Sequence, residues 1–129
     1  MEINLPDVLR ELTEQFERYE EAVKNYQPEV LAECFWQDPR TLRYGVAENL
    51  HGYEKITAYR HARAKTGGAP TRRLRRTVIT TFGRDFGTAN TEYVRTGTGK
   101  VGRQSQTWVR LPEGWRIVSA HVSLLQESD

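Results

Sequence analysis

The sequence predicts an α+β fold in which three helices pack on one face of a curved, mostly antiparallel sheet. Two observations support this class. An apolar stripe at helical spacing fills the first 26 residues, and alternating segments separated by glycine-containing turns fill the chain after residue 71. Helices that precede a run of hairpins are typical of α+β domains, in which the helices cover one face of the sheet.

The first helix is predicted by apolar residues that recur mostly three or four positions apart. They are Leu5, Val8, Leu9, Leu12, Phe16, Tyr19, Val23 and Tyr26. Pro6 suits a first helical turn, and Pro28 ends the helix because the residue before a proline avoids helical angles. We expect a short second helix over residues 28–35 and a third over residues 53–65. The third helix carries on one side Ile56, Tyr59, Arg60 and Arg63.

The strands are predicted from alternation and from the turns between them. Residues 41–44 form a short extended segment, and the long strands are expected over residues 72–81, 85–96, 102–111 and 115–125. Each pair of neighbouring long strands is separated by a glycine-containing turn, which favours hairpins.

The last strand has apolar residues in both of its parities, the alternate positions whose side chains face opposite sides of a sheet. Trp115 and Ile117 occupy odd-numbered positions, and Val118, Val122 and Leu124 occupy even-numbered ones. Because the helices can cover only one face of the sheet, we predict that a second subunit covers the other, which makes a homodimer.

Composition fits one globular domain over residues 1–129. Apolar residues make up 37% of the chain and charged residues 28%. No stretch approaches the roughly 18 apolar residues of a membrane span, and the N-terminus lacks the order of a signal peptide. The single cysteine, Cys34, cannot form an internal disulfide, so we expect a reducing, cytoplasmic setting.

Nucleic-acid and metal chemistry are poorly supported. A net charge of +2 attracts nucleic acid weakly. The arginine cluster at residues 72–76 lacks interleaved aromatic residues, and alternation sends its arginines to both sides of a strand. This favours a solvated or acid-paired edge over an anion-attracting rim or a nucleic-acid surface. The three histidines and one cysteine show no metal-ligand spacing, and no phosphate loop or nucleophile elbow occurs.

Two residues are the leading candidates for chemistry. Tyr19 lies on the apolar stripe, so its hydroxyl either bonds a backbone group or serves a pocket as hydrogen-bond donor or general acid. Arg43 lies between Leu42 and Tyr44 in a short apolar segment, and a buried arginine needs an anionic partner. That partner is either an internal carboxylate such as Glu48 or a substrate carboxylate, which a guanidinium binds with two parallel hydrogen bonds.

Four further residues are candidates for binding a substrate. Gln104 and Gln106 share a strand face with Trp108, where two amides beside an indole either line a polar pocket or face a half-exposed sheet. His121 is either a core or interface histidine or a proton-transfer group. Trp36 follows the second helix and belongs either to the core or to the pocket wall.

Several motifs resemble a known family. The order of elements resembles that of SnoaL-like and ketosteroid-isomerase-like proteins in the NTF2-like superfamily. More narrowly, the stretches FERY (16–19), TLRYG (41–45), GRQSQTW (102–108), GWRI (114–117) and AHVS (120–123) are similar to the AtzH/HpxZ family. The resemblance spans nearly the whole chain and implies a cone-shaped domain with an internal pocket.

The resemblance also implies a function. AtzH-type proteins act in cyanuric acid catabolism, where they convert 1,3-dicarboxyurea into allophanate with loss of carbon dioxide, and their functional tyrosine and arginine match Tyr19 and Arg43. Ketosteroid isomerases carry a carboxylate base where this sequence has Arg43, so steroid isomerisation is not expected. The implied activity is that of a cofactor-free decarboxylase or decarboxylating amidohydrolase-like enzyme on a small urea-derived dicarboxylate.

The alternative is a protein without catalytic activity. HpxZ-type members accompany oxalurate and purine breakdown, which implies a small-anion-binding or accessory protein of a ureide or oxalurate amidase pathway, with an amidase as its partner. A pocket with one tyrosine, one arginine and no clear base would serve either role. Both readings predict a small carboxylate ligand and neither requires a nucleic acid or a membrane.

Overall fold

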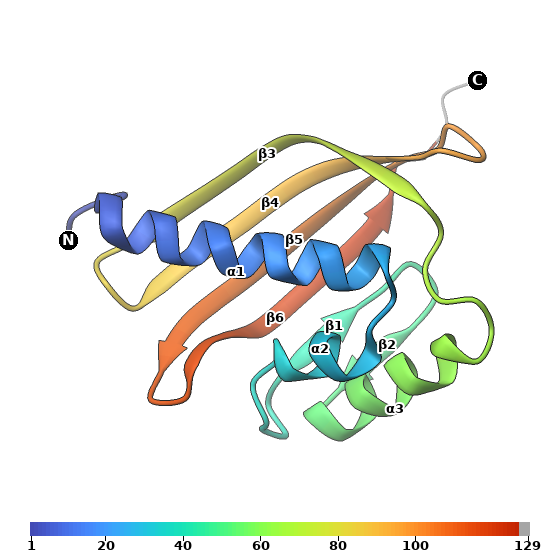
Figure 1. Cartoon of the computed structure of the whole chain (residues 1–129), viewed down its shortest axis with the longest axis horizontal. Coiled ribbons are helices and arrows are strands. Elements are labelled where there is room, and N and C mark those ends of the chain that lie inside the picture. Colours follow the sequence, from blue (N-terminus) through green and yellow to red (C-terminus); the bar gives the residue numbers. More distant parts are fainter. Residues whose placement is uncertain (127–129) are drawn as a thin grey trace.

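The computed structural model describes residues 1–126 and has three helices and a six-stranded sheet within them. The helices are α1 (Pro6–Lys24), α2 (Pro28–Glu33) and α3 (Tyr53–Ala64), and the strands are β1 (Leu42–Tyr44), β2 (Asn49–His51), β3 (Arg72–Phe82), β4 (Phe86–Arg95), β5 (Val101–Leu111) and β6 (Gly114–Leu124). Helix α1 lies along one face of the long strands, while α2 and α3 pack beside the short strands β1 and β2 (Figure 1). None of the described helices is long and apolar enough to cross a membrane.

The sheet is mixed, although all but one of its pairings are antiparallel. Its strand order is β2-β1-β6-β5-β4-β3, and the pairing of β1 with β6 is parallel. The α+β fold and the mostly antiparallel sheet predicted from the sequence are therefore confirmed. Strand β2 and the parallel pairing were not predicted, because three residues are too few to show an alternation.

The hydrophobic core lies between α1, α2 and the sheet. Val8, Leu12 and Phe16 of α1 are buried against Trp108 of β5 and Ile117 of β6. One turn further along α1, the buried stripe reaches Tyr19, and from there the interior becomes polar. The spacing of the stripe therefore places Tyr19 at the border between the dry core and an internal cavity.

The apolar residues in both parities of β6 are explained by a β-bulge and not by a second subunit that covers the outer face of the sheet. The register of β5 and β6 shifts so that Thr107 pairs with Ser119 while Trp108 pairs with Ile117, which leaves Val118 as the extra residue of a β-bulge. The bulge reverses the alternation, so that Trp115, Ile117, Ala120 and Val122 are all buried on the helix-covered side. The inference of a doubly covered strand was wrong, and it no longer supports a homodimer.

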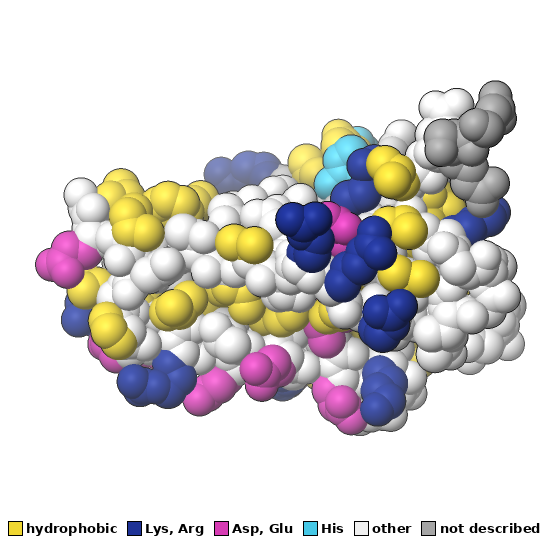
Figure 2. All heavy atoms as spheres, turned by 90° about the horizontal axis from the view of Figure 1, so that it is seen from above, with side chains coloured by type: hydrophobic (Ala, Val, Ile, Leu, Met, Phe, Trp, Pro, Cys, Tyr) yellow, Lys and Arg dark blue, Asp and Glu magenta, His cyan; other side chains and the backbone are white. Residues whose placement is uncertain are grey.

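The arginine cluster opens β3, which is an edge strand of the sheet. Arg75 pairs with Glu92 at 3.0 Å and Arg72 pairs with Glu20 at 2.6 Å, as an acid-paired edge predicts, while Arg73 and Arg76 are exposed. Figure 2 shows basic side chains gathered with acidic ones over this part of the surface. The cluster is split because Arg72 turns inward toward the cavity, whereas its neighbours stay outside.

A glycine on β5 holds one wall of the cavity in place. Gly102 pairs across the sheet with Tyr93, and a Cβ at residue 102 would overlap the Tyr93 ring. We expect Gly102→Ala to lower the free energy of unfolding by about 1–3 kcal/mol, the usual cost of overpacking, measured by urea denaturation. Gly97→Ala is the matched control: that turn has open space around it, so its effect should stay within about 0.5 kcal/mol. Equal effects of the two substitutions would refute this packing account.

Candidate active site

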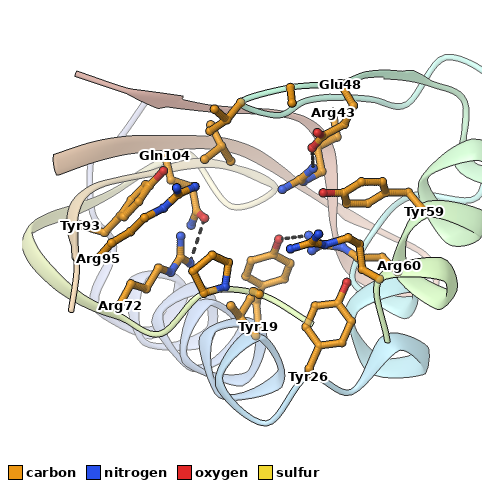
Figure 3. Close-up of a pocket in the computed structure, with 17 residues that line it drawn as sticks. Tyr19, Tyr26, Arg43, Glu48, Tyr59, Arg60, Arg72, Tyr93, Arg95 and Gln104 are labelled. Atoms are coloured by element: carbon orange, nitrogen blue, oxygen red, sulfur yellow. Dashed lines mark hydrogen bonds and ion pairs between the residues drawn. The ribbon is translucent and has the colours of Figure 1, made fainter. Parts of the chain in front are cut away.

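An internal cavity of about 370 Å³ opens beyond Tyr19, within the size range of small-molecule sites (Figure 3). Helices α1 and α3, strands β1, β3, β4, β5 and β6, and the loops after β1 and before β3 all contribute to its wall. Its polar lining residues are Tyr19, Tyr26, Arg43, Glu48, Tyr59, Arg60, Arg63, Arg72, Tyr93, Arg95 and Gln104.

The lining carries a clear excess of positive charge. Five arginines line the cavity, whereas Glu48 is its one lining carboxylate among the described residues. A second carboxylate, Glu20, contacts Arg72 from the side of α1. A concave, partly desolvated site with an excess of one charge sign concentrates ligands of the opposite sign, so this cavity is suited to a small anion carrying more than one negative charge.

Arg60 is the most deeply buried cation of the site. Its side chain is 3% exposed, and none of the ion pairs within residues 1–126 includes it. Instead, its Nη2 donates a hydrogen bond of 2.5 Å to the hydroxyl oxygen of Tyr19. Because Arg60 uses an acceptor lone pair of the phenol, the proton of Tyr19 remains free to be donated to another group.

The Arg60 guanidinium remains charged in spite of its burial. Burial lowers the pKa of Arg60, but the neighbouring Tyr19 and Tyr26 phenols outweigh it, so that the pKa of Arg60 is raised overall. The Nε of Arg60 and the hydroxyl of Tyr26 are buried without a hydrogen-bond partner among the described residues. Buried donors that lack acceptors are uncommon in proteins, and here they border one cavity, which indicates that the site is short of acceptors.

Arg43 pairs with an internal carboxylate, which is one of the two possible partners raised by the sequence. Its Nη1 pairs with Glu48 Oε1 at 3.0 Å, and its guanidinium also lines the cavity and lies over the Tyr59 ring at 5.5 Å. The pair depends on Gly45, because a Cβ there would overlap the Glu48 carboxylate. Burial, and then the Glu48 charge, raise the pKa of Tyr59, which keeps this phenol neutral and able to donate a hydrogen bond.

The opposite wall contains a second group of cations. Arg72 Nη2 contacts Glu20 at 2.6 Å and the Gln104 side-chain oxygen at 3.1 Å, while Gln104 Nε2 donates to Glu20 at 3.0 Å. The Arg72 guanidinium also lies 4.9 Å from the centre of the Tyr93 ring. Arg95 reaches the same part of the cavity from β4 (Figure 3).

The structure brings together three of the six residues singled out by the sequence. Tyr19, Arg43 and Gln104 line the cavity. The other three, Trp36, Gln106 and His121, are not part of its lining.

Each of the three outlying residues has a structural environment of its own. Gln106 is buried in the core and accepts a hydrogen bond from the Trp108 indole at 3.0 Å. Trp36 is half-buried and stacks with Arg40, and His121 is exposed on the sheet face away from α1, against the ring of Tyr44. Their positions give no support to a role in binding a substrate in this cavity.

The described part of the chain gives little support to a reactive cysteine or a metal site. Cys34 is buried, and burial raises the pKa of its thiol, which makes it a poor nucleophile. Residues 1–126 contain no group of three or more His, Cys, Asp or Glu side chains that could hold a metal ion.

Sequence reasoning missed Arg60, Arg72 and Arg95 as site residues. Arg60 shared a helix side with Ile56 and Tyr59, which was a usable signal that it points inward. Arg72 was hidden in a cluster whose neighbours are exposed, and Arg95 is the last residue of β4, where the alternation is weakest. Only the fold shows that these three side chains share one cavity.

Comparisons with known proteins show what the chain is similar to. A solved structure of a protein of unknown function from Pectobacterium atrosepticum is 54% identical over 96% of this chain and 95% of that one, with a TM-score of 0.90. A cystatin-like fold protein from Burkholderia xenovorans is 45% identical over 99% of both chains, with a TM-score of 0.91. An NTF2-like superfamily protein from Salmonella enterica shares the fold, with 24% identity over 95% of this chain and 94% of that one and a TM-score of 0.74.

The family assignment rests on a match that covers almost the whole chain. No curated protein is significantly similar to it. The family model described as AtzH-like matches residues 1–128, which include every residue of the cavity. The fold is NTF2-like, as the resemblance implied. This chain belongs to the AtzH-like family.

Proposed function

We propose that this protein is a cofactor-free decarboxylase of a small urea-derived dicarboxylate, which converts 1,3-dicarboxyurea into allophanate and carbon dioxide. The observation that carries the proposal is the cationic cavity in which Arg60 is buried against Tyr19 and has no carboxylate partner among residues 1–126. Such a site favours a dianion and presents a phenolic proton beside it. Membership of the AtzH-like family supports the choice of substrate.

The reaction requires the delivery of one proton. As the bond between nitrogen and the carboxylate carbon breaks, its electron pair stays on nitrogen, which takes the proton of Tyr19. Carbon dioxide leaves, allophanate remains, and the phenolate is reprotonated from solvent. Positioned proton transfer of this kind contributes roughly a hundred- to ten-thousand-fold.

Arg43 and Arg60 have different roles in the proposed reaction. Arg43 binds a carboxylate of the substrate and fixes its orientation, which lowers the entropic part of the barrier. Arg60 holds the Tyr19 oxygen in place and stabilises the negative charge that develops on it while the proton leaves.

The non-catalytic alternative uses the same cavity. Glu48, the lining carboxylate, is bound to Arg43, so the described residues leave the site no free carboxylate as a base. Such a site would also suit a small-anion-binding or accessory protein beside an amidase. The release of carbon dioxide from 1,3-dicarboxyurea by the purified protein separates the two, because an accessory protein would bind the dianion without turnover.

We also propose that the protein forms a homodimer through the sheet face that α1 leaves uncovered. The support lies in large apolar side chains such as Val78 and Phe86, which are 57% and 42% exposed. Sedimentation at micromolar concentration should show a dimer, and a monomer at all accessible concentrations would rule this proposal out.

Tyr19→Phe tests the proposed proton donor. We expect the turnover of 1,3-dicarboxyurea to fall by roughly a hundred- to ten-thousand-fold while the affinity for glutarate, a non-reacting dicarboxylate of similar length, changes little. Tyr26→Phe is the matched control, because it removes another phenolic hydroxyl of the same cavity. A larger loss of turnover in Tyr26→Phe than in Tyr19→Phe would transfer the donor role to Tyr26.

Arg43→Ala separates a binding role from a structural one. As a buried, hydrogen-bonded anion contact, its loss should weaken glutarate binding by roughly 2–5 kcal/mol in calorimetric titrations. Glu48→Gln is the control, since it breaks the internal ion pair but keeps the guanidinium, and it should preserve or tighten glutarate binding. If Arg43→Ala instead lowers stability by roughly 3–5 kcal/mol with unchanged glutarate affinity, Arg43 serves only the fold.

A further inference from the structure

The geometry points to a second carboxylate subsite, formed by Arg72 and Arg95 on the cavity wall opposite Arg43 and Arg60, which makes the protein select dianions over monoanions. This inference rests on the proposed function, because it assigns the second carboxylate of the same substrate. Figure 3 shows Arg72 and Arg95 on one side of the cavity and Arg43 and Arg60 on the other.

The two arginines of the subsite are direct neighbours across the sheet. Arg72 on β3 pairs in register with Arg95 on β4, and both line the cavity. Like charges directly opposite one another on neighbouring strands are destabilising unless an anion lies between or beside them. The sheet therefore holds two guanidiniums in a position where they need negative charge.

The described residues supply only part of that charge. Glu20 pairs with Arg72, and Gln104 bridges the two, which fixes the direction of the Arg72 side chain. Arg72 Nε has no partner among the described residues. Arg95 belongs to none of the ion pairs within residues 1–126. One carboxylate thus faces two cations, and a ligand carboxylate would balance the second.

The arrangement selects a particular class of ligand. Two cationic groups on opposite walls of one cavity suit an elongated molecule with a carboxylate at each end. Contacts to the carboxylate that does not react can also be used to orient the reacting end beside Tyr19.

Calorimetric titration of two non-reacting ligands at fixed ionic strength tests the subsite. Glutarate carries a carboxylate at each end, and butyrate has one carboxylate on a similar carbon chain. In Arg95→Gln we expect glutarate affinity to fall about ten- to a hundredfold while butyrate affinity stays within about twofold, since one charged hydrogen-bonding group is lost. Arg95→Lys, which keeps the charge but not the fork, should lie between.

Arg73→Gln is the matched control, because it removes the same charge from the exposed neighbour of Arg72. It should leave both affinities unchanged. Equal losses for glutarate and butyrate in Arg95→Gln, unchanged glutarate affinity in that variant, or no glutarate binding to the wild-type protein would overturn the subsite. These outcomes are independent of turnover. If Arg95→Gln loses the preference for glutarate over butyrate but the wild-type protein does not decarboxylate 1,3-dicarboxyurea, the subsite stands and the proposed reaction is rejected.

Discussion

The burial of the Arg60 guanidinium against a phenol instead of a carboxylate is the constraint on which the site depends. A buried cation is costly unless it is paired, and the hydrogen bond to Tyr19 joins α3 to α1 across 41 residues of sequence. The same bond orients the Tyr19 hydroxyl, and the charge of Arg60 has no counterion in the described part of the chain. The site therefore has a positioned proton donor and a need for an anion, both created by one contact.

The sheet determines where this contact lies. The parallel pairing of β1 with β6 places Arg43 opposite Ala120, so that β1 extends the wall beyond the long strands. The bulge at Val118 turns Ala120 and Val122 to the same, helix-covered side as Ile117. Strand β6 therefore packs in the core at Ile117 and lines the cavity further along, at Val122. The division into a dry half and a polar half follows from these two irregularities.

The sequence predicted well what depends on local periodicity. The apolar stripe of the first helix predicted that Tyr19 points inward. The apolar neighbours of Arg43 predicted a buried guanidinium in need of an anion, with Glu48 as one of its two possible partners. The boundaries of the long strands were predicted closely, because alternation and glycine turns are local signals.

The rest depends on contacts between distant residues. A bulge inserts a residue without a marker in the sequence, so the parity of β6 was misread at Val118. The cavity-facing positions of Arg72 and Arg95 follow from how β3 and β4 pack, and no periodic pattern distinguishes them from surface arginines. His121 was a candidate because of its residue type, but its strand parity directs it away from the cavity.

A crystal structure of the protein with bound glutarate tests the central claim most directly. The account predicts one carboxylate within hydrogen-bonding distance of Arg43 or Arg60 and the other beside Arg72 and Arg95, with the Tyr19 hydroxyl facing the carbon chain. Glutarate bound only on the outer surface, or a cavity that excludes it at saturating concentration, would contradict the account.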